Sequence, residues 1–201
     1  MQAAAHLSGL ASDTLWAVFP VNVPNILTVL RVLLVPVLVV ALLANTPDGD
    51  LIAAIVFVLA SLTDFFDGWL ARRRSSITTF GKLMDPLADK LLIAASLIAL
   101  VSLNRVAAWV AMVIIAREFA VTAMRMVAQQ QGVIVAAGMF GKVKTCMQIA
   151  AILALIAFPS GAVWVDALVY ATVAITVASG VDYFFGIRRR MEEAERVEPT
   201  P

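Results

Sequence analysis

The sequence has almost none of the side chains that form disulfides or bind soft metals. It contains one cysteine and one histidine among 201 residues. Cys146 has no partner for an intrachain disulfide, so the redox compartment stays undetermined, and its apolar surroundings predict a packing role. His6 has no metal-ligand partner nearby and is assigned no chemistry.

Charged residues are also scarce, and no segment looks like a soluble domain. They make up 14% of the chain, hydrophobic residues make up 62%, and the mean hydropathy is +0.93. These values predict an integral membrane protein. No repeat, low-complexity tract or nucleic-acid signature is present, so a nucleic-acid partner is not expected. Residues 1–20 lack a basic start and a long apolar run, which predicts a short interfacial helix rather than a cleaved signal peptide.

Apolar windows of roughly 20 residues predict an all-α, polytopic protein with six transmembrane helices. These helices and the short connections between them form one membrane domain, residues 21–188, followed by a solvated cytoplasmic tail, residues 189–201. The predicted spans are Val23–Ala44, Leu51–Arg72, Lys82–Leu103, Val106–Val127, Met139–Phe158 and Val163–Gly186.

Basic residues alternate along the connections between these spans. Lysine and arginine gather at and beside the second connection, on both flanks of the fourth (Arg125, Lys142 and Lys144) and at the start of the tail. The first connection is acidic, the fifth is uncharged, and the third carries only Arg105. The positive-inside rule then places both termini in the cytoplasm. We therefore expect a multi-pass protein of the inner (cytoplasmic) membrane, with its active site facing the cytoplasm.

Four aspartates stand between segments that are apolar enough to span a membrane. An ionised carboxylate near a bilayer core costs at least about 2.5 kcal/mol, so four in 26 residues indicate a functional site. On helices, Asp64 and Asp67 share one face, and Asp85 and Asp89 share another. Carboxylates alone suit Mg²⁺ or Mn²⁺ better than zinc, and two such ions would balance four negative charges.

The residues around these aspartates follow a fixed pattern that resembles the signature of the CDP-alcohol phosphotransferases. The pattern runs from Asp64 to Asp89 and also includes Gly68, Ala71, Arg72 and Gly81. The resemblance implies attack of an alcohol hydroxyl on a CDP-linked lipid, with release of CMP. It further implies a homodimer, and a catalytic Asp89 that takes the acceptor's proton, although spacing alone does not separate base from metal ligand among the four.

Donor-binding residues are expected around the second connection and at the start of the first span. Small residues at 68, 71 and 81 leave room for CDP-diacylglycerol against the backbone, Arg72 suits a diphosphate oxygen, and Thr78 lies in the loop between the helices. Asn25 and Thr28 belong to a segment, ending at Arg31, that resembles the opening of these enzymes. Arg31 has two interpretations, a functional buried charge or a side chain that snorkels to the surface.

A second basic cluster predicts a pocket for a phosphate-bearing acceptor. It consists of Arg117 and Arg125 in the fourth span and Lys142 and Lys144 at the start of the fifth. The strings around these residues resemble bacterial family members that transfer a phosphatidyl group to glycerol 3-phosphate. That acceptor is the expectation, an inositol phosphate acceptor is the close alternative, and a divalent-cation carrier is the alternative from another class of protein.

Overall fold

The computed structural model describes the backbone of residues 23–44, 46–74, 79–130 and 139–197, and the side chains of residues 26–44, 46–63, 87–130 and 139–190. Over this part of the chain the structure is entirely helical, in agreement with the predicted fold class. The helices are α2 (Val23–Leu43), α3 (Gly49–Arg74), α4 (Thr79–Ser102), α5 (Ala108–Gln130), α6 (Met139–Ala157) and α7 (Val163–Val197).

Each helix coincides with one predicted apolar window, and most of their ends differ by only a few residues. The largest difference is in α7, which continues past Gly186 to Val197 and so includes most of the segment predicted as a tail. The interfacial helix predicted over residues 1–20 lies outside the described residues.

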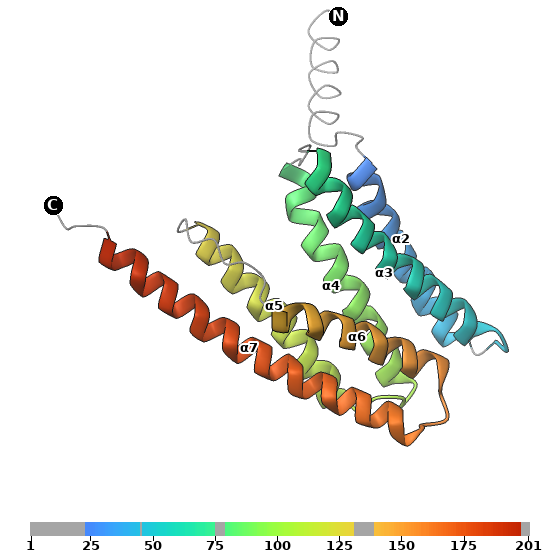
Figure 1. The fold of residues 1–201 in the computed structure, drawn as a ribbon. Coiled ribbons are helices and arrows are strands. Elements are labelled where there is room, and N and C mark those ends of the chain that lie inside the picture. The colour runs from blue at the N-terminus through green and yellow to red at the C-terminus, as the bar shows by residue number, and fades with distance from the viewer. Residues whose placement is uncertain (1–22, 45, 75–78, 131–138, 198–201) are drawn as a thin grey trace, which may run out of the picture.

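The helices form two groups that meet at one end and diverge toward the other (Figure 1). In one group α2 packs against α3 and α4, and in the other α7 packs against α5 and α6. Contacts of α4 with α5 and of α3 with α6 join the two groups. The start of α2 and the end of α7 lie at the diverging end (Figure 1).

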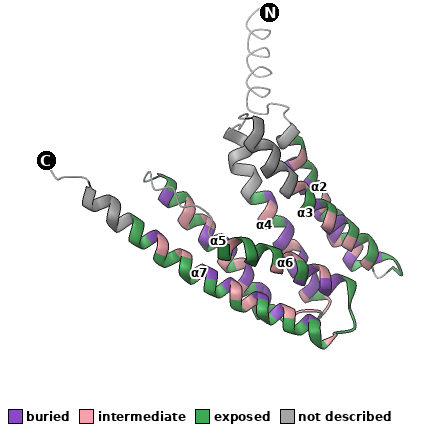
Figure 2. Ribbon diagram, viewed as in Figure 1, coloured by how far each residue is buried: buried purple, intermediate pink, exposed green. Residues whose placement is uncertain are grey.

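Apolar side chains fill the joined end and also cover much of the outer surface. Leu38, Phe57, Leu100 and Ile156 are fully buried between the helices. Large hydrophobic side chains also point outward, such as Leu33 and Met112, which are 60% and 64% exposed. Figure 2 shows the resulting pattern of buried inner and exposed outer helix faces. Exposed hydrophobic residues on this scale suit a lipid environment.

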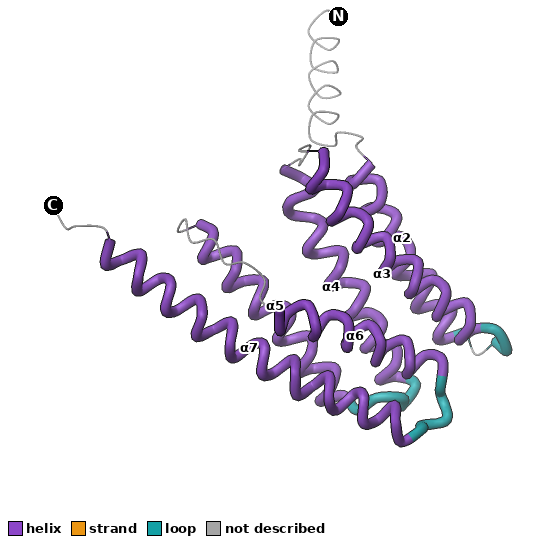
Figure 3. The backbone as a smooth tube through the Cα atoms, in the orientation of Figure 1, coloured by secondary structure: helices purple, strands orange, loops and turns teal. Residues whose placement is uncertain are grey.

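The three connections at the joined end are short, and one of them places a key ion pair (Figure 3). At the end of α4, Asn104 adopts a positive φ of 56°. The Arg105 amide then donates to the Leu100 carbonyl and the Asn104 amide to the Val101 carbonyl, which is a Schellman cap. This cap places Arg105 beside the start of α3.

The Arg105 guanidinium ties the loop between α4 and α5 to two other helices at this end. It donates two hydrogen bonds to the Asp50 carboxylate, of 2.8 and 2.9 Å, and one of 3.2 Å to the Ile156 carbonyl. A bidentate arginine–carboxylate pair has a defined geometry as well as charge. The first residues of α3, the loop before α5 and the end of α6 are therefore held in one arrangement, from which the helices diverge toward the site.

Three of the helices are long and apolar enough to cross a membrane by length and composition. Among the described residues these spans are Ile26–Leu43, Met139–Ala157 and Val163–Arg190, and Gly49–Thr63 forms a shorter apolar segment. In α5 the charged residues Arg117, Glu118 and Arg125 interrupt the apolar sequence. The chain is thus a membrane protein with several apolar helices, and the polar interruptions mark the site described next.

Candidate functional site

A cleft of about 680 Å³ opens where the two groups of helices diverge. It is lined by residues near the middle of α4, from the middle to near the end of α5, at the start of α6 and near the middle of α7. Its charged residues are Asp89, Lys90, Arg117, Glu118, Arg125, Lys142, Lys144 and Asp182. Cations outnumber carboxylates in this lining, so the cleft suits an anionic ligand.

All four cations predicted from the sequence to bind an acceptor line this one cleft, together with Asp89. Arg117 and Arg125 come from α5, and Lys142 and Lys144 come from α6. Lys142 is exposed, whereas Lys144 is buried. The two lysines therefore have different surroundings, although they are only two residues apart in the sequence.

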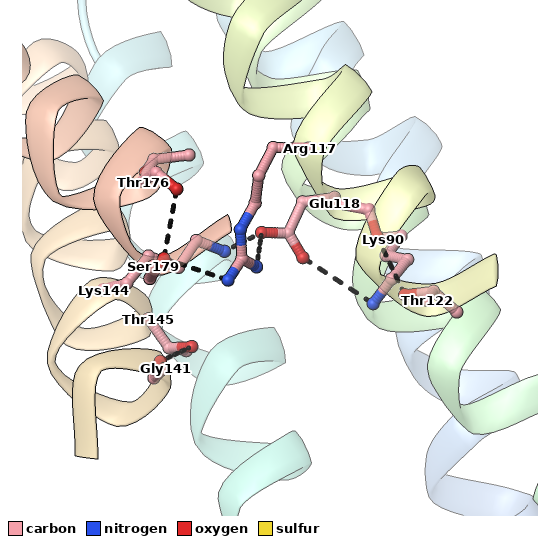
Figure 4. Close-up of polar contacts among 9 residues, drawn as sticks. All are labelled: Lys90, Arg117, Glu118, Thr122, Gly141, Lys144, Thr145, Thr176 and Ser179. Atoms are coloured by element: carbon pink, nitrogen blue, oxygen red, sulfur yellow. Dashed lines mark hydrogen bonds and ion pairs between the residues drawn. The ribbon is translucent and has the colours of Figure 1, made fainter. Parts of the chain in front are cut away.

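Glu118 is the centre of a buried cluster of charges that joins three helices (Figure 4). Its carboxylate forms an ion pair with the Lys144 ammonium of α6. The Lys90 ammonium of α4 lies 3.7 Å from Oε2, and the Arg117 guanidinium lies 3.5 Å from Oε1. Removing one member of such a cluster leaves the others buried without enough opposite charge. Glu118 thus holds three cations together at the inner end of the cleft.

The two α5 arginines are both held by α7. Nη2 of Arg117 donates to Ser179 Oγ at 3.0 Å. Nε of Arg125 donates to the Tyr183 hydroxyl oxygen at 3.1 Å, and the Arg125 guanidinium carbon lies 5.5 Å from the centroid of the Tyr183 ring. Two arginines eight residues apart on α5 therefore meet two residues four apart on α7.

A smaller cavity of about 30 Å³ lies behind the cleft and connects it to α3. Ser61 of α3 and Gln148 of α6 line it, beside Asp89, Glu118 and Lys144. The volume is sufficient for a water molecule, and the polar lining would provide hydrogen-bond partners for one. Asp89 borders both spaces and so lies between the α3 side of the protein and the charged cluster.

Thr28 and Arg31 of α2 are both buried. Thr28 is 2% exposed, and Arg31 is 1% exposed. A snorkelling arginine keeps its guanidinium at the surface. Burial of Arg31 inside the helix group therefore contradicts the snorkelling interpretation and favours the other one, a functional buried charge.

Most of the predicted metal and donor residues have side chains outside the described part. Their backbones, except that of Thr78, belong to described helices: Asp64 and Asp67 lie on α3, and Asp85 and Asp89 lie on α4. Among the described side chains there is no group of three or more potential metal ligands. The predicted residues whose side chains lie outside the described part are Asn25, Asp64, Asp67, Gly68, Ala71, Arg72, Thr78, Gly81 and Asp85.

Several residues of the cleft were not predicted from the sequence. Lys90 follows Asp89 directly, which was an available signal, but Ser179 and Tyr183 are separated from the α5 arginines by about 60 residues. Glu118 directly follows Arg117 in an otherwise apolar segment, which was a further available signal. Cys146 was predicted to pack, but it is exposed and lines the cleft.

Comparisons with known proteins identify the family. The family model described as CDP-alcohol phosphatidyltransferase matches residues 21–179. A CDP-diacylglycerol–glycerol-3-phosphate 3-phosphatidyltransferase of Bacillus subtilis is 41% identical over 184 residues, covering 81% of this chain and 93% of that protein. A protein of the same name from Salmonella choleraesuis is 36% identical over 176 residues, covering 83% of this chain and 95% of that one.

A third relative comes from Mycobacterium tuberculosis and is named as a probable phosphatidylglycerophosphate synthase. It is 41% identical over 167 residues, covering 81% of this chain and 79% of that protein. The matched family region contains all four aspartates, the α5 arginines and the α6 lysines. The chain belongs to the CDP-alcohol phosphatidyltransferase family.

Proposed function

We propose that the protein is a phosphatidylglycerophosphate synthase, which transfers the phosphatidyl group of CDP-diacylglycerol to sn-glycerol 3-phosphate and releases CMP. The observation that carries this proposal is the set of relatives named for this reaction, at 36–41% identity over about four fifths of the chain. The cationic cleft supports it independently, because it matches an acceptor that carries a phosphate.

The proposed reaction has a simple balance of bonds. The acceptor hydroxyl attacks the phosphorus that bears the diacylglycerol, a new P–O bond forms, and the bond from that phosphorus to the CMP oxygen breaks. Asp89 accepts the proton of the attacking hydroxyl, and CMP leaves with the electron pair of the broken bond. Asp89 lines the cleft that contains the cations, so a hydroxyl held there would lie on the same side of α4.

The cofactor in this proposal is Mg²⁺ or Mn²⁺, with two ions bound by Asp64, Asp67, Asp85 and Asp89. A ligand set made only of carboxylates fits such hard cations. When bound, the ions would polarise the diphosphate and offset the charge that develops on the leaving phosphate. Donor binding is assigned to Asn25, Thr28, Gly68, Ala71, Arg72, Thr78 and Gly81.

Acceptor phosphate binding is assigned to Arg117, Arg125, Lys142 and Lys144. Charge-assisted hydrogen bonds to a phosphate are stronger than those between neutral groups, and arginine adds a planar, two-pronged geometry. The inositol phosphate alternative has the same charge, and the names of the relatives favour glycerol 3-phosphate over it. Membership of a transferase family argues against the cation carrier.

An acceptor competition would test this assignment. The purified protein, given labelled CDP-diacylglycerol and Mg²⁺, should release CMP with glycerol 3-phosphate and far less with inositol phosphate or serine. In the Arg125→Gln variant the acceptor KM should rise about tenfold to a hundredfold, because a charge-assisted hydrogen bond is lost. The KM for CDP-diacylglycerol should stay near its original value. Preference for inositol phosphate, or equal loss of donor and acceptor affinity, would refute the assignment.

The proposed membrane arrangement is a multi-pass protein of the inner membrane, with six transmembrane helices and both termini in the cytoplasm. It is supported by the basic residues Arg125 near the end of α5, Lys142 at the start of α6 and Arg188 in the last part of α7. The end of α7 lies at the diverging end (Figure 1). A homodimer is proposed from the resemblance to the family, and the molar mass of the protein in detergent would test it.

Cysteine labelling in intact cells would test the orientation. In a Cys146→Ala background, a cysteine at Asp48 should react with a membrane-impermeant maleimide. A cysteine at Ser76 should react only after the cells are opened. Labelling at Ser76 from outside would reverse the proposed orientation, and labelling of both positions from outside would contradict the assignment of α3 as a membrane span.

A further inference from the structure

Residues on one face of α7 contact the two arginines of α5. Ser179, Gly180 and Tyr183 follow Thr176 by three, four and seven residues and therefore lie along one side of the helix. Ser179 and Tyr183 each accept a hydrogen bond from an α5 guanidinium. None of these α7 residues carries a charge. They therefore orient the guanidinium groups of α5 rather than attract them electrostatically.

The Ser179 hydroxyl has a defined orientation. It donates its proton to the Thr176 carbonyl at 3.1 Å, and Ser179 is only 3% exposed. A hydroxyl group has one proton to donate and lone pairs to accept with. Because the proton is already used within α7, the oxygen can only accept toward Nη2 of Arg117. Ser179 thus binds Nη2 of Arg117 and fixes the position of this nitrogen relative to α7 (Figure 4).

Gly180 lets the Arg117 side chain lie directly against the α7 backbone. A Cβ atom at position 180 would lie 3.2 Å from Cγ of Arg117 and 3.7 Å from its Nε. The first distance is closer than an ordinary carbon–carbon contact, and Cγ belongs to the inner stem of the side chain rather than to its movable end. An alanine at this position would therefore displace the stem, and with it the guanidinium.

Tyr183 plays the corresponding part for Arg125. Its hydroxyl oxygen accepts from Nε, which leaves the two terminal nitrogens of Arg125 available to face the cleft. The ring also lies against the guanidinium carbon. A hydrogen bond at Nε combined with ring contact restricts the rotation of the arginine, so less freedom remains to be lost when an anion binds.

We infer that Ser179, Gly180 and Tyr183 of α7 are positioning residues, which aim Arg117 and Arg125 at the acceptor's phosphate. The inference rests on the proposed function, because it takes the cleft as the acceptor site. It adds a role for the last helix, which supplies no proposed ligand of the metal or the donor. The acceptor's affinity is then determined by the packing of α7 on α5 as well as by the charges of α5 and α6.

The test compares three variants with two matched controls. Ser179→Ala and Tyr183→Phe each remove a hydrogen-bond partner of an arginine and keep the rest of the side chain. Gly180→Ala adds a methyl group against Arg117 and favours the helical conformation. Gly186→Ala is its control, because a Cβ there has no neighbour within 4 Å. Tyr170→Phe is the control for Tyr183, because Tyr170 is 57% exposed and lies at the other end of α7.

The expected result is a selective loss of acceptor affinity. Ser179→Ala and Tyr183→Phe should each raise the KM for glycerol 3-phosphate about tenfold, since each loosens one charged donor. Gly180→Ala should raise it about threefold to tenfold by shifting a guanidinium out of place. The KM for CDP-diacylglycerol should not move in any of them, and both controls should match the unmodified protein.

A second readout does not depend on turnover. Cys146, the only thiol, is exposed and lines the cleft, so bound glycerol 3-phosphate should slow its reaction with a maleimide. Protection should require more glycerol 3-phosphate in the three variants than in the controls. If the unmodified protein shows neither protection nor acceptor-dependent CMP release, the proposed function fails. If it shows both and the variants behave like their controls, only the positioning role is overturned.

Discussion

Replacing Asp89 by asparagine should nearly abolish CMP release while leaving the protein folded and inserted in the membrane. The amide keeps the size of the side chain but can neither accept the acceptor's proton nor provide a charged oxygen. Loss of a general base alone lowers a rate by about 10²–10⁴-fold. The same replacement at Asp64, Asp67 or Asp85 should also remove most activity. The measurement is acceptor-dependent release of labelled CMP from CDP-diacylglycerol.

Dependence on Mg²⁺ would separate the two roles assigned to these aspartates. A variant that has lost only a metal ligand should recover part of its activity when the Mg²⁺ concentration is raised, whereas one that has lost the base should not. Asp166→Asn is the control, because Asp166 is exposed and lies at the joined end of the helices. Substantial activity in more than one of the four variants would contradict the proposed metal site.

Replacing Glu118 by glutamine should have the largest effect on stability. The change removes a carboxylate that pairs with Lys90, Arg117 and Lys144, whose side chains are each at most 15% exposed. Breaking a buried ion pair by removing one partner costs about 3–5 kcal/mol, because the remaining charges stay buried. The free energy of unfolding in detergent should fall by about this amount, and Asp48→Asn, at an exposed position, should leave it unchanged.

An added anion should rescue the Glu118→Gln variant. Glycerol 3-phosphate or inorganic phosphate in the cleft would restore negative charge beside the three cations. A ligand that binds only the folded state stabilises it in proportion to the logarithm of its concentration. The melting temperature of the variant should therefore rise more steeply with either anion than that of the unmodified protein. An equal response in both proteins would show that Glu118 does not balance the cations of the cleft.

The helices of this protein could be predicted closely from its sequence, because a membrane leaves little choice of backbone structure. Every backbone polar group must be satisfied within the chain, so a long apolar run becomes a helix. This constraint accounts for the agreement between the apolar windows and α2–α7. It does not act on the end of α7, where the charged residues after Gly186 predict the end of the membrane span and a solvated, frayed helix end; the helix continues to Val197.

The site could be predicted in part. Residues close together in the sequence could be grouped into one site, whereas contacts between residues far apart in the sequence could not be predicted. The cations at 117, 125, 142 and 144 belong to two consecutive helices, so their clustering followed from a short connection, and they do line one cleft. Arg31 had two interpretations, because a sequence does not tell whether a charge in an apolar helix faces lipid, the surface or another helix. The structure buries it within the helix group.

The sequence by itself determined the family, the helices, and the kind of chemistry expected of four carboxylates between apolar segments and of a basic cluster. These properties depend on residue type and local spacing, which the chain carries whatever its partners are. Only the tertiary structure decided that Glu118 gathers cations from α4, α5 and α6, and that Ser179, Gly180 and Tyr183 of α7 meet the α5 arginines. Such contacts depend on how helices distant in sequence pack, and apolar periodicity specifies which face of a helix is buried but not which helix covers it.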